Sequence, residues 1–395
     1  MILRPSLFLI LSSTLLSGCS WVGNYLAGKD NTEPPAKLTP VKSVFTVHRV
    51  WQRDTGRGSA ELSLRLKPHL VGDRVFVVDL KGTVTALTAS TGQVLWTTET
   101  KQAISSGPGA NEHIVVVGTT QGRLVALKAD SGKILWTAKL TSEILAPPIV
   151  AGNQVLARTI DGRITGMTLQ NGQRLWSYAR PTPVLTIRGN SMPVVHKGRV
   201  YVGWDDGYVT CLQADTGHVV WEKSMTQVRG RTELERLVDI DADPVIDNDV
   251  LYVTAYQGRL VAVNLASGQV LWERKMSAFK SITLDDRFIY VTDEHSHIWA
   301  FERQHGTLAW KQTELTARKL TGPTVIDGML VVADYEGYIH WLSLKDGKIQ
   351  GRNRGDSKGY LEAPLVHAKH VLVLGRSGTL SVFSTQKSKH AVSDE

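Results

Sequence analysis

The chain has 395 residues, of which 42% are hydrophobic and 21% charged, so it is long enough to bury a large core. Its formal net charge of +8 is modest for this length, and the basic residues are scattered along the chain instead of forming runs. This distribution argues against a nucleic acid as the partner.

The N-terminus has the pattern of a bacterial lipoprotein signal. Arg4 is followed by a mainly apolar stretch from Leu7 to Leu16, and a Ser-Gly pair leads directly into Cys19. About ten apolar residues are too few to span a bilayer. The four residues ending at Cys19 resemble the lipobox, in which the cysteine takes a diacylglycerol and becomes the first residue of the mature chain. We therefore expect a signal peptide over residues 1–18 and a lipid on Cys19.

The lipobox also has consequences for location and for disulfides. Because Ser20 and not Asp follows Cys19, the lipoprotein sorting rules imply the outer membrane, with the chain facing the periplasm. With Cys19 committed to lipid, Cys211 is the only other cysteine, so an intramolecular disulfide cannot form.

Residues 19–43, which include the lipidated cysteine, are rich in Pro, Gly and charge and lack periodicity, which predicts a flexible tether. Residues 386–395 are polar, which predicts a disordered tail. One domain is expected between them, over residues 44–385.

One unit recurs along this domain. A turn containing Gly is followed by an apolar residue and Trp, in the pattern Thr-Gly-x-x-Leu-Trp or close variants. The six copies end at Trp96, Trp136, Trp176, Trp221, Trp272 and Trp310, and a degenerate copy ends at Gly351. Successive copies are 38 to 51 residues apart, which is typical of propeller blades. A second marker, an alternating strand after a turn residue, starts at Gly82, Gly122, Gly162, Gly207, Gly258, Ser296, Gly337 and Gly378.

Each period contains four short strands joined by tight turns. A four-stranded antiparallel sheet without helices can bury both faces only against its neighbours, and radial stacking does this for every sheet. The recurring Trp would supply a large apolar surface between blades. The last unit, from Pro364 to Phe383, lacks a Trp strand, whereas Val50 and Trp51 form a Trp strand without a blade. We expect an all-β, eight-bladed propeller whose last blade is closed by strands from both ends of the chain.

Two successive blades carry long connections. The distance from Trp to the Pro just before the next blade is 17 residues from Trp176 to Pro193 and 23 from Trp221 to Pro244, but 11 from Trp136 to Pro147 and 13 from Trp310 to Pro323. Both long connections should lie on the same face of the ring, where recognition commonly resides. We therefore expect one continuous patch there.

Five residues of the patch are candidates for a site. Leu185 and Ile187 stand two apart in a segment expected to be extended, so both would point the same way and offer an apolar anchor. Arg188 would face elsewhere. Asp239 and Asp241 share the same spacing, and carboxylates near an Arg form charge-assisted hydrogen bonds. The residues alone leave two interpretations open: an interface for a partner, or an intramolecular brace between blades with Leu185 and Ile187 buried beneath.

Other residues that invite a chemical role have a structural explanation. His295 and His297 would project to one face of a strand, but they lie in a turn and lack an evident third metal ligand. Cys211 stands where other blades have Ala, which predicts a small core residue. Sequence motifs of serine hydrolases, zinc proteases and phosphate-binding loops do not occur. We predict no catalytic, cofactor-binding or metal-binding residues.

The repeat resembles the tryptophan-docking motif of pyrroloquinoline-quinone propellers over nearly all of residues 50–385. Two families share this motif: quinoprotein alcohol dehydrogenases and the non-catalytic BamB lipoproteins of the outer-membrane β-barrel assembly (BAM) machinery. The lipobox, the Pro-containing tether and the eight blades are similar to BamB. The dehydrogenase pattern requires adjacent cysteines and a catalytic Asp beside Ca²⁺, and this chain has no adjacent cysteines and no room for the long insertions. The resemblance implies a non-catalytic scaffold without a cofactor.

The same resemblance implies partners. In the BamB family the corresponding positions contribute to binding BamA, and the resemblance carries that role to Leu185, Ile187, Arg188, Asp239 and Asp241. Through BamA the chain would contact the other BAM lipoproteins. Unfolded outer-membrane proteins are a second class of partner, because exposed blade edges can add a strand to another sheet. A periplasmic quinone-dependent dehydrogenase stays an alternative, as does a propeller that binds peptidoglycan or a small ligand in its central channel.

Overall fold

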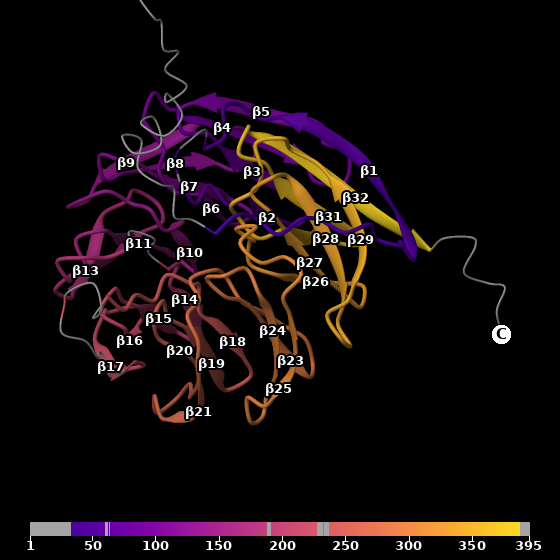
Figure 1. The fold of residues 1–395 in the computed structure, drawn as a ribbon. Coiled ribbons are helices and arrows are strands. Elements are labelled where there is room, and N and C mark those ends of the chain that lie inside the picture. The colour runs from indigo at the N-terminus through magenta and orange to yellow at the C-terminus, as the bar shows by residue number, and fades with distance from the viewer. Residues whose placement is uncertain are drawn as a thin grey trace, which may run out of the picture. The chain divides into compact units, whose positions relative to one another are not determined.

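Eight small β-sheets arranged around a central axis make up the fold (Figure 1). The computed structural model describes residues 33–59, 62, 64–187, 191–226, 232 and 237–387. Contacts divide the chain into residues 1–34 and a unit that begins at Pro35, and the sheets lie in the second unit. Each sheet is antiparallel and four-stranded, so the unit is an eight-bladed β-propeller, as the sequence predicts. Within the described residues, no helix is long and apolar enough to cross a membrane.

The blades follow one another along the chain. Blade 1 contains β2 (His69–Val71), β3 (Arg74–Val78), β4 (Thr83–Thr88) and β5 (Val94–Glu99). Blade 2 contains β6 (Gly109–Ala110), β7 (Ile114–Gly118), β8 (Arg123–Lys128) and β9 (Ile134–Lys139). Blade 3 contains β10 (Ile149–Ala151), β11 (Gln154–Thr159), β12 (Arg163–Thr168) and β13 (Arg174–Ala179). Blade 4 contains β14 (Val194–His196), β15 (Arg199–Gly203), β16 (Tyr208–Gln213) and β17 (Val219–Ser224).

Blade 5 contains β18 (Val245–Asp247), β19 (Val250–Thr254), β20 (Arg259–Asn264) and β21 (Val270–Lys275). Blade 6 contains β22 (Thr283–Leu284), β23 (Phe288–Thr292), β24 (Ile298–Glu302) and β25 (Leu308–Gln312). Blade 7 contains β26 (Thr324–Ile326), β27 (Met329–Ala333), β28 (Tyr338–Ser343) and β29 (Ile349–Arg354). Blade 8 contains β30 (Leu365–His367), β31 (His370–Leu374), β32 (Thr379–Lys387) and, from the other end of the chain, β1 (Phe45–Asp54).

The first strand of each blade lies near the axis and the fourth lies at the rim (Figure 1). Each link from the rim strand of one blade to the axial strand of the next therefore runs over the same face of the ring. We call this the connection face. It includes the two links expected to be long, residues 180–193 before blade 4 and 225–244 before blade 5. The link before blade 1, residues 55–68, is as long as the first of these.

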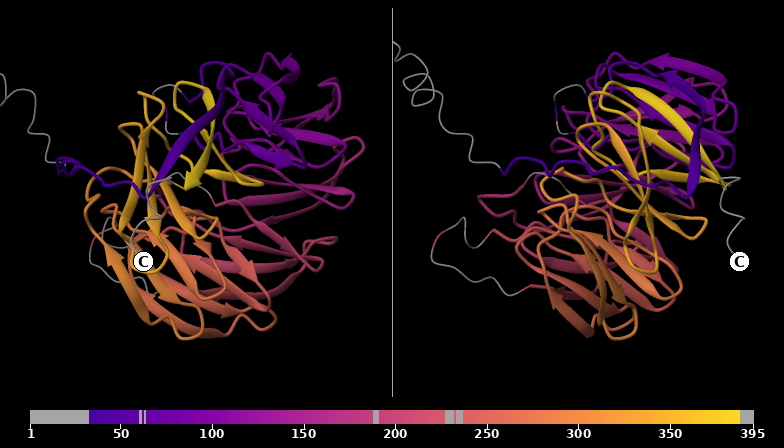
Figure 2. Two further views of the ribbon diagram at one scale, coloured as in Figure 1. Left: turned by 90° about the vertical axis from the view of Figure 1, so that its right-hand side faces the viewer. Right: turned by 45° about the vertical axis from the view of Figure 1, so that its right-hand side comes forward.

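The ring is closed by the two ends of the domain, which confirms the expected shared blade. Strand β1 pairs antiparallel with β32, from Phe45 opposite Lys387 to Asp54 opposite Thr379. Figure 2 shows the indigo strand β1 beside the yellow strand β32. The pairing continues to Lys387, two residues beyond the expected end of the domain at 385.

Tryptophans of the rim strands join consecutive blades. Each indole Nε1–H donates a hydrogen bond to a backbone carbonyl of the following blade, at 2.8–3.2 Å. The pairs are Trp51 with Ala89, Trp96 with Ala129, Trp136 with Leu169, Trp176 with Ala214, Trp221 with Leu265, Trp272 with Arg303 and Trp310 with Leu344. The ring also covers the turn Gly of that blade, so closely that a Cβ on Gly132 would lie 2.5 Å from the Trp96 ring. The Gly and the Trp of the repeat are thus parts of one contact.

Blade 7 departs from the repeat for a structural reason. Gly351 occupies the Trp position and pairs with Trp341, which occupies the usual Ala position. The next blade has no turn at its rim, because β32 and β1 come from opposite ends of the chain. A Trp at 351 would have no turn Gly to cover. Phe45 of β1 fills the space instead, in edge contact with Trp341 at 5.9 Å between ring centroids.

The segment before β1 is bound to blades 6 and 7. Ala36 donates its N–H to the carbonyl of Thr316, at 2.9 Å, and its own carbonyl accepts from Arg318, at 2.9 Å. The carbonyl of Thr39 accepts from Arg352, at 2.8 Å. Residues 36–43 therefore contact the propeller, and the flexible tether expected over 19–43 is shorter by these residues.

Candidate partner-binding site

The two long links of the connection face come together beside the axis. Leu185 and Ile187 belong to the link before blade 4, and Asp239 and Asp241 to the link before blade 5. Arg188 lies outside the described residues, as does Cys19. The proximity of the two links was expected from their adjacency in the ring.

The apolar pair of the first link does not form one buried cluster. Leu185 is 45% exposed, and its neighbour Val184 is 90% exposed. Ile187 is half-buried and lines the central cavity. The brace interpretation placed both Leu185 and Ile187 in the interior, so its expectation for Leu185 is wrong. An exposed aliphatic pair at residues 184 and 185 is available for contact with another molecule.

Asp239 joins the two links. Its Oδ2 accepts a hydrogen bond from the N–H of Ile187, at 3.1 Å, and its backbone carbonyl accepts from the N–H of Tyr256, at 2.8 Å. The side chain is fully buried. Burial, followed by the nearby carboxylates of Asp241 and Asp205, raises the pKa of Asp239 to about 9. Asp239 therefore acts as an internal brace that fixes the backbone at Ile187.

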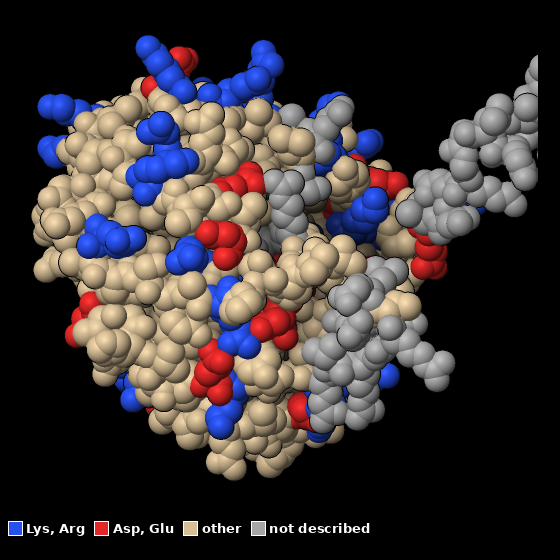
Figure 3. All heavy atoms as spheres, turned by 90° about the vertical axis from the view of Figure 1, so that its left-hand side faces the viewer, with Lys and Arg blue, Asp and Glu red and all other residues tan. Residues whose placement is uncertain are grey.

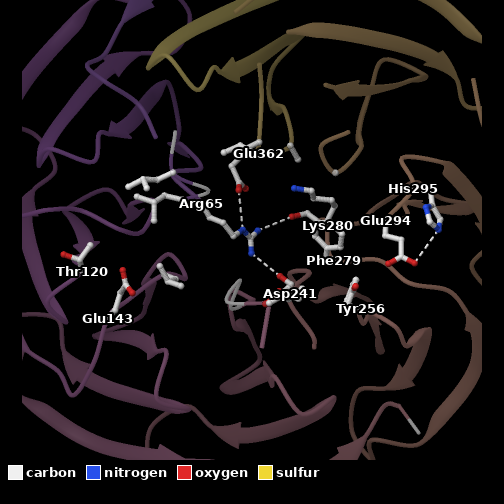
Figure 4. A pocket seen from close by; sticks show the side chains of 18 residues that line it. Arg65, Thr120, Glu143, Asp241, Tyr256, Phe279, Lys280, Glu294, His295 and Glu362 are labelled. Carbon is white, nitrogen blue, oxygen red and sulfur yellow. Dashed lines mark hydrogen bonds and ion pairs between the residues drawn. The ribbon is translucent and has the colours of Figure 1, made fainter. Parts of the chain in front are cut away.

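Asp241 lies at the wall of a central cavity of about 1050 Å³ (Figure 4). Arg65, from the link before blade 1, reaches into the middle of this cavity and donates from Nη1 to the backbone carbonyl of Asp241, at 3.1 Å. Apolar side chains share the lining with these charges, among them Leu64, Leu145, Ile187, Tyr256, Phe279 and Leu361. The cavity is thus lined by both charged and apolar side chains. Two of the predicted site residues, Ile187 and Asp241, belong to its wall.

A third acidic residue, Asp243, is the main partner of Arg65. The guanidinium donates two parallel hydrogen bonds, at 3.1 Å to Oδ1 and 3.0 Å to Oδ2, and its Nε lies 3.4 Å from Oε1 of Glu362. Asp243 also accepts from the N–H of Met192, at 2.8 Å, and from Ser281. Burial opposes ionisation of Asp243, but Arg65 outweighs it and keeps the pKa of Asp243 below its ordinary value. This cluster joins links from opposite sides of the ring.

Neither Arg65 nor Asp243 was expected from the sequence, which does contain a signal for another buried cation. Arg158 of β11 forms an ion pair with Asp205 and donates to Ser191 Oγ at 3.2 Å. Both charged side chains are almost fully buried. The equivalent register positions in the other blades are Val78, Gly118, Gly203, Thr254, Thr292, Ala333 and Leu374. A lone Arg at a position that is otherwise uncharged marks the boundary between blades 3 and 4 as unusual.

His297 and Cys211 are residue types that invite a chemical role, but both have contacts that explain them as parts of the fold. Both ring nitrogens of His297 are engaged, Nδ1 with Asp293 at 3.0 Å and Nε2 with Thr316 at 3.1 Å. The described residues contain no cluster of three or more His, Cys, Asp or Glu side chains suited to a metal ion. Cys211 is fully buried and pairs with Trp221, as Ala86 pairs with Trp96. Burial raises the pKa of its thiol, so it packs as a small apolar residue.

Comparison with known proteins assigns the family. A family model described as outer membrane protein assembly factor BamB matches residues 46–110 and 80–312. The outer membrane protein assembly factor BamB of Legionella pneumophila (strain Paris) is 42% identical over 383 residues, which cover 97% of this chain and 100% of the relative. The chain belongs to the BamB family. Membership connects it with outer-membrane protein assembly, as the resemblance in the repeat implied.

Solved structures agree with the BamB assignment. The crystal structure of BamB from Moraxella catarrhalis superposes with a TM-score of 0.79 at 25% identity, covering 86% of this chain and all of that one. A quinohemoprotein alcohol dehydrogenase from Comamonas testosteroni superposes with a TM-score of 0.70 at 13% identity, covering 88% of this chain and 78% of that one. At that identity the likeness to the dehydrogenase extends to the fold alone.

Proposed function

We propose that this chain is a non-catalytic scaffold of the BAM machinery that supports the assembly and insertion of β-barrel proteins into the outer membrane. The observation that carries the proposal is the near full-length match to an outer membrane protein assembly factor. The main partner is BamA, and the other BAM lipoproteins are reached through it. The fold suits this role because a ring of blades presents a wide, rigid face from which short loops project.

The proposed contact with BamA is the connection face around the links before blades 4 and 5. Leu185 supports this assignment, because an exposed Leu beside an exposed Val is a natural anchor for a partner. Ile187 and Asp241 belong to the adjoining wall of the central cavity. Asp239 contributes indirectly, by holding the backbone at Ile187. Arg188 follows Ile187 directly in the sequence and completes the proposed site.

The proposed anchor is a lipid on Cys19 that holds the chain at the periplasmic surface of the outer membrane. Among the described residues, Ala36 is the first that is hydrogen-bonded to the propeller, and its partner Thr316 belongs to a link of the connection face. Seventeen positions separate Cys19 from Ala36, which corresponds to at most about 60 Å of extended chain. Ala36, at the link before blade 7, would therefore stay within about 60 Å of the membrane.

Substitution of Leu185 tests the proposed contact. Leu185→Asp places a charge in the apolar anchor and should lower the affinity for the purified periplasmic region of BamA at least about tenfold. Leu175→Asp is the matched control, since Leu175 is exposed to a similar extent, 49% against 45%, but lies on the rim strand β13. Equal losses from both substitutions would contradict the assignment.

A second experiment identifies the partner in the cell. A photocrosslinking side chain at position 187 or 188 should capture BamA, and the same group at position 175 should not. Charge reversal by Arg188→Glu should reduce co-purification of BamA with the folded chain. If the fold and the co-purification both survive Arg188→Glu, the proposed site is wrong.

A further inference from the structure

A groove of about 440 Å³ lies at the rim between blades 2 and 3. At four other junctions, the side chain two residues after the docking Trp donates to the carbonyl of the turn Gly in the next blade. These pairs are Arg53 with Gly92, Thr98 with Gly132, Arg274 with Gly306 and Gln312 with Gly347. Ala138 occupies this position in blade 2 and is too short to reach Gly172. The space that a longer side chain fills elsewhere is therefore left open.

The groove has a cationic lining. Arg163 and Arg174 line it, and no carboxylate side chain is among its lining residues. Lys139 also borders it, but its Nζ donates to the carbonyl of Gln121 within blade 2. Arg163 has one ion pair, at 3.4 Å to Asp161, in which both side chains are about one-third exposed or more. Arg174 makes no ion pair or side-chain hydrogen bond within the described part of the chain. Figure 3 faces the side on which β9, β13 and β17 lie, and blue Lys and Arg side chains are spread over it.

One wall of the groove is the free edge of a strand. Residues 138–141 line it, and β9 is the outermost strand of blade 2. The N–H of Leu140 donates to Gly122 within blade 2, at 2.7 Å. In an antiparallel pair successive residues alternate in direction, so the N–H and C=O of Lys139 point away from the blade. Unpaired backbone groups of this kind accept a further extended segment.

We propose that this groove binds an extended, acidic peptide segment of a partner protein. Its main chain pairs with the edge at Lys139, and its carboxylates meet Arg163 and Arg174. A peptide is favoured over other anions because the groove combines cations with an unpaired strand edge. The junctions that contain Arg53, Thr98, Arg274 or Gln312 have no such groove, because those side chains occupy the space. The site is separate from the proposed BamA contact and does not depend on it.

A pair of charged peptides tests the proposal. The fluorescein-labelled peptide Glu-Val-Glu-Val-Glu should bind the full chain in an anisotropy titration, and Lys-Val-Lys-Val-Lys should not. Binding should weaken as salt is raised, because the proposed contacts are partly exposed. Arg163→Glu and Arg174→Glu should each weaken binding at least about tenfold. The matched control is Lys345→Glu, which reverses an exposed charge in a turn of blade 7.

A neutral substitution separates the groove from general attraction by charge. Ala138→Gln should fill the space as Gln312 does between blades 6 and 7, and abolish binding while both arginines remain. Unchanged thermal unfolding would show that the variant is folded.

Undiminished binding by Ala138→Gln would overturn the proposal, as would equal binding of both peptides. Binding to phosphatidylglycerol vesicles without peptide binding would overturn it in favour of lipid. Leu185→Asp should leave peptide affinity unchanged.

Discussion

Asp239 is a buried carboxyl group with one hydrogen-bond donor, the N–H of Ile187. Its other oxygen, Oδ1, has no partner within the described residues. Two further acids, Asp241 and Asp205, disfavour a negative charge at this place. A protonated Asp239 still accepts the bond from Ile187 through Oδ2. The brace therefore depends on the shape of the side chain and does not require its charge.

Replacement of Asp239 by Asn tests this interpretation. The pKa of Asp239 rises from an ordinary value of 3.8 to about 9 on folding, so the folded state retains a proton that the unfolded state releases. The contribution of this group to stability is therefore complete below about pH 4 and is lost as the pH rises towards 9. Asp239→Asn should fold, keep the bond to Ile187 and lack this pH dependence. Its free energy of unfolding relative to the wild type should rise across that window.

Urea unfolding of both proteins at several pH values measures this difference. Asp215→Asn is the control, because Asp215 lies in an exposed turn of blade 4. A difference between Asp239→Asn and the wild type that stays constant from pH 4 to 9 would show that Asp239 is ionised in the folded state.

At the scale of one strand, β1 both closes blade 8 and completes the packing of blade 7. Phe45 is 8% exposed and occupies the space that a docking Trp fills at seven other junctions. A Cβ on Gly351 would lie 2.8 Å from its ring. The aromatic group at this junction thus comes from the following blade instead of the preceding one. The direction of docking is reversed only where the ring is closed.

Truncation of Phe45 should be costly. Phe45→Ala removes the ring that packs on Trp341 and Gly351 and should lower the free energy of unfolding by about 3–5 kcal/mol. Val50→Ala, in the same strand at 44% exposure, should cost well under 1 kcal/mol. Denaturant unfolding followed by tryptophan fluorescence measures both. Similar losses in the two variants would mean that Phe45 contributes only through strand propensity.

Blades 1 to 6 were predictable because each contains the turn Gly and the Trp of the repeat. The shared blade was also predictable, because Trp51 has no blade before it and the last unit has no Trp strand. The role of Phe45 did not follow, because nothing near Gly351 in the sequence indicates that an aromatic ring from position 45 replaces the missing Trp. Ser296 is a milder case, in which a non-Gly residue adopts the positive φ of 67° that the turn requires.

At the scale of the whole molecule, Arg65 connects links that are far apart in the ring. It comes from the link before blade 1 and binds Asp243 before blade 5 and Glu362 before blade 8. A ring of blades has strong contacts between neighbours and few across its centre. Arg65 supplies such a contact at the level of the proposed BamA site. Its pKa is raised above the ordinary value, because the carboxylates outweigh the cost of burial.

Loss of Arg65 should destabilise the fold and disturb the site. Arg65→Ala leaves Asp243 and Glu362 without their cation in a mainly buried place, and should lower the free energy of unfolding by about 3–5 kcal/mol. Arg74→Ala removes an ion pair to Glu112, whose side chain is 66% exposed, and should cost less than about 1 kcal/mol. Thermal and denaturant unfolding compare the two. Equal effects would show that the central cluster is as weak as a surface pair.

The central cluster also marks the limit of prediction from the sequence. The link lengths after Trp176 and Trp221 indicated two of the three longest links, but the third, residues 55–68, contains Arg65. Arg65 and Asp243 are 178 positions apart, and no local pattern connects them. Ion pairs across a ring depend on how far each link reaches towards the axis, and this becomes apparent only when all the links are seen together.

The docked segment before β1 has a mechanical consequence. A pull on the chain from its N-terminal side first loads the hydrogen bonds of Ala36 and Thr39 to blades 6 and 7. Only after these yield would the force act on β1, the strand that closes the ring. Its nine paired positions with β32 carry bonds perpendicular to the strand, so an axial pull strains them together instead of one by one. The ring is thus protected against being opened from the end at which it would be tethered.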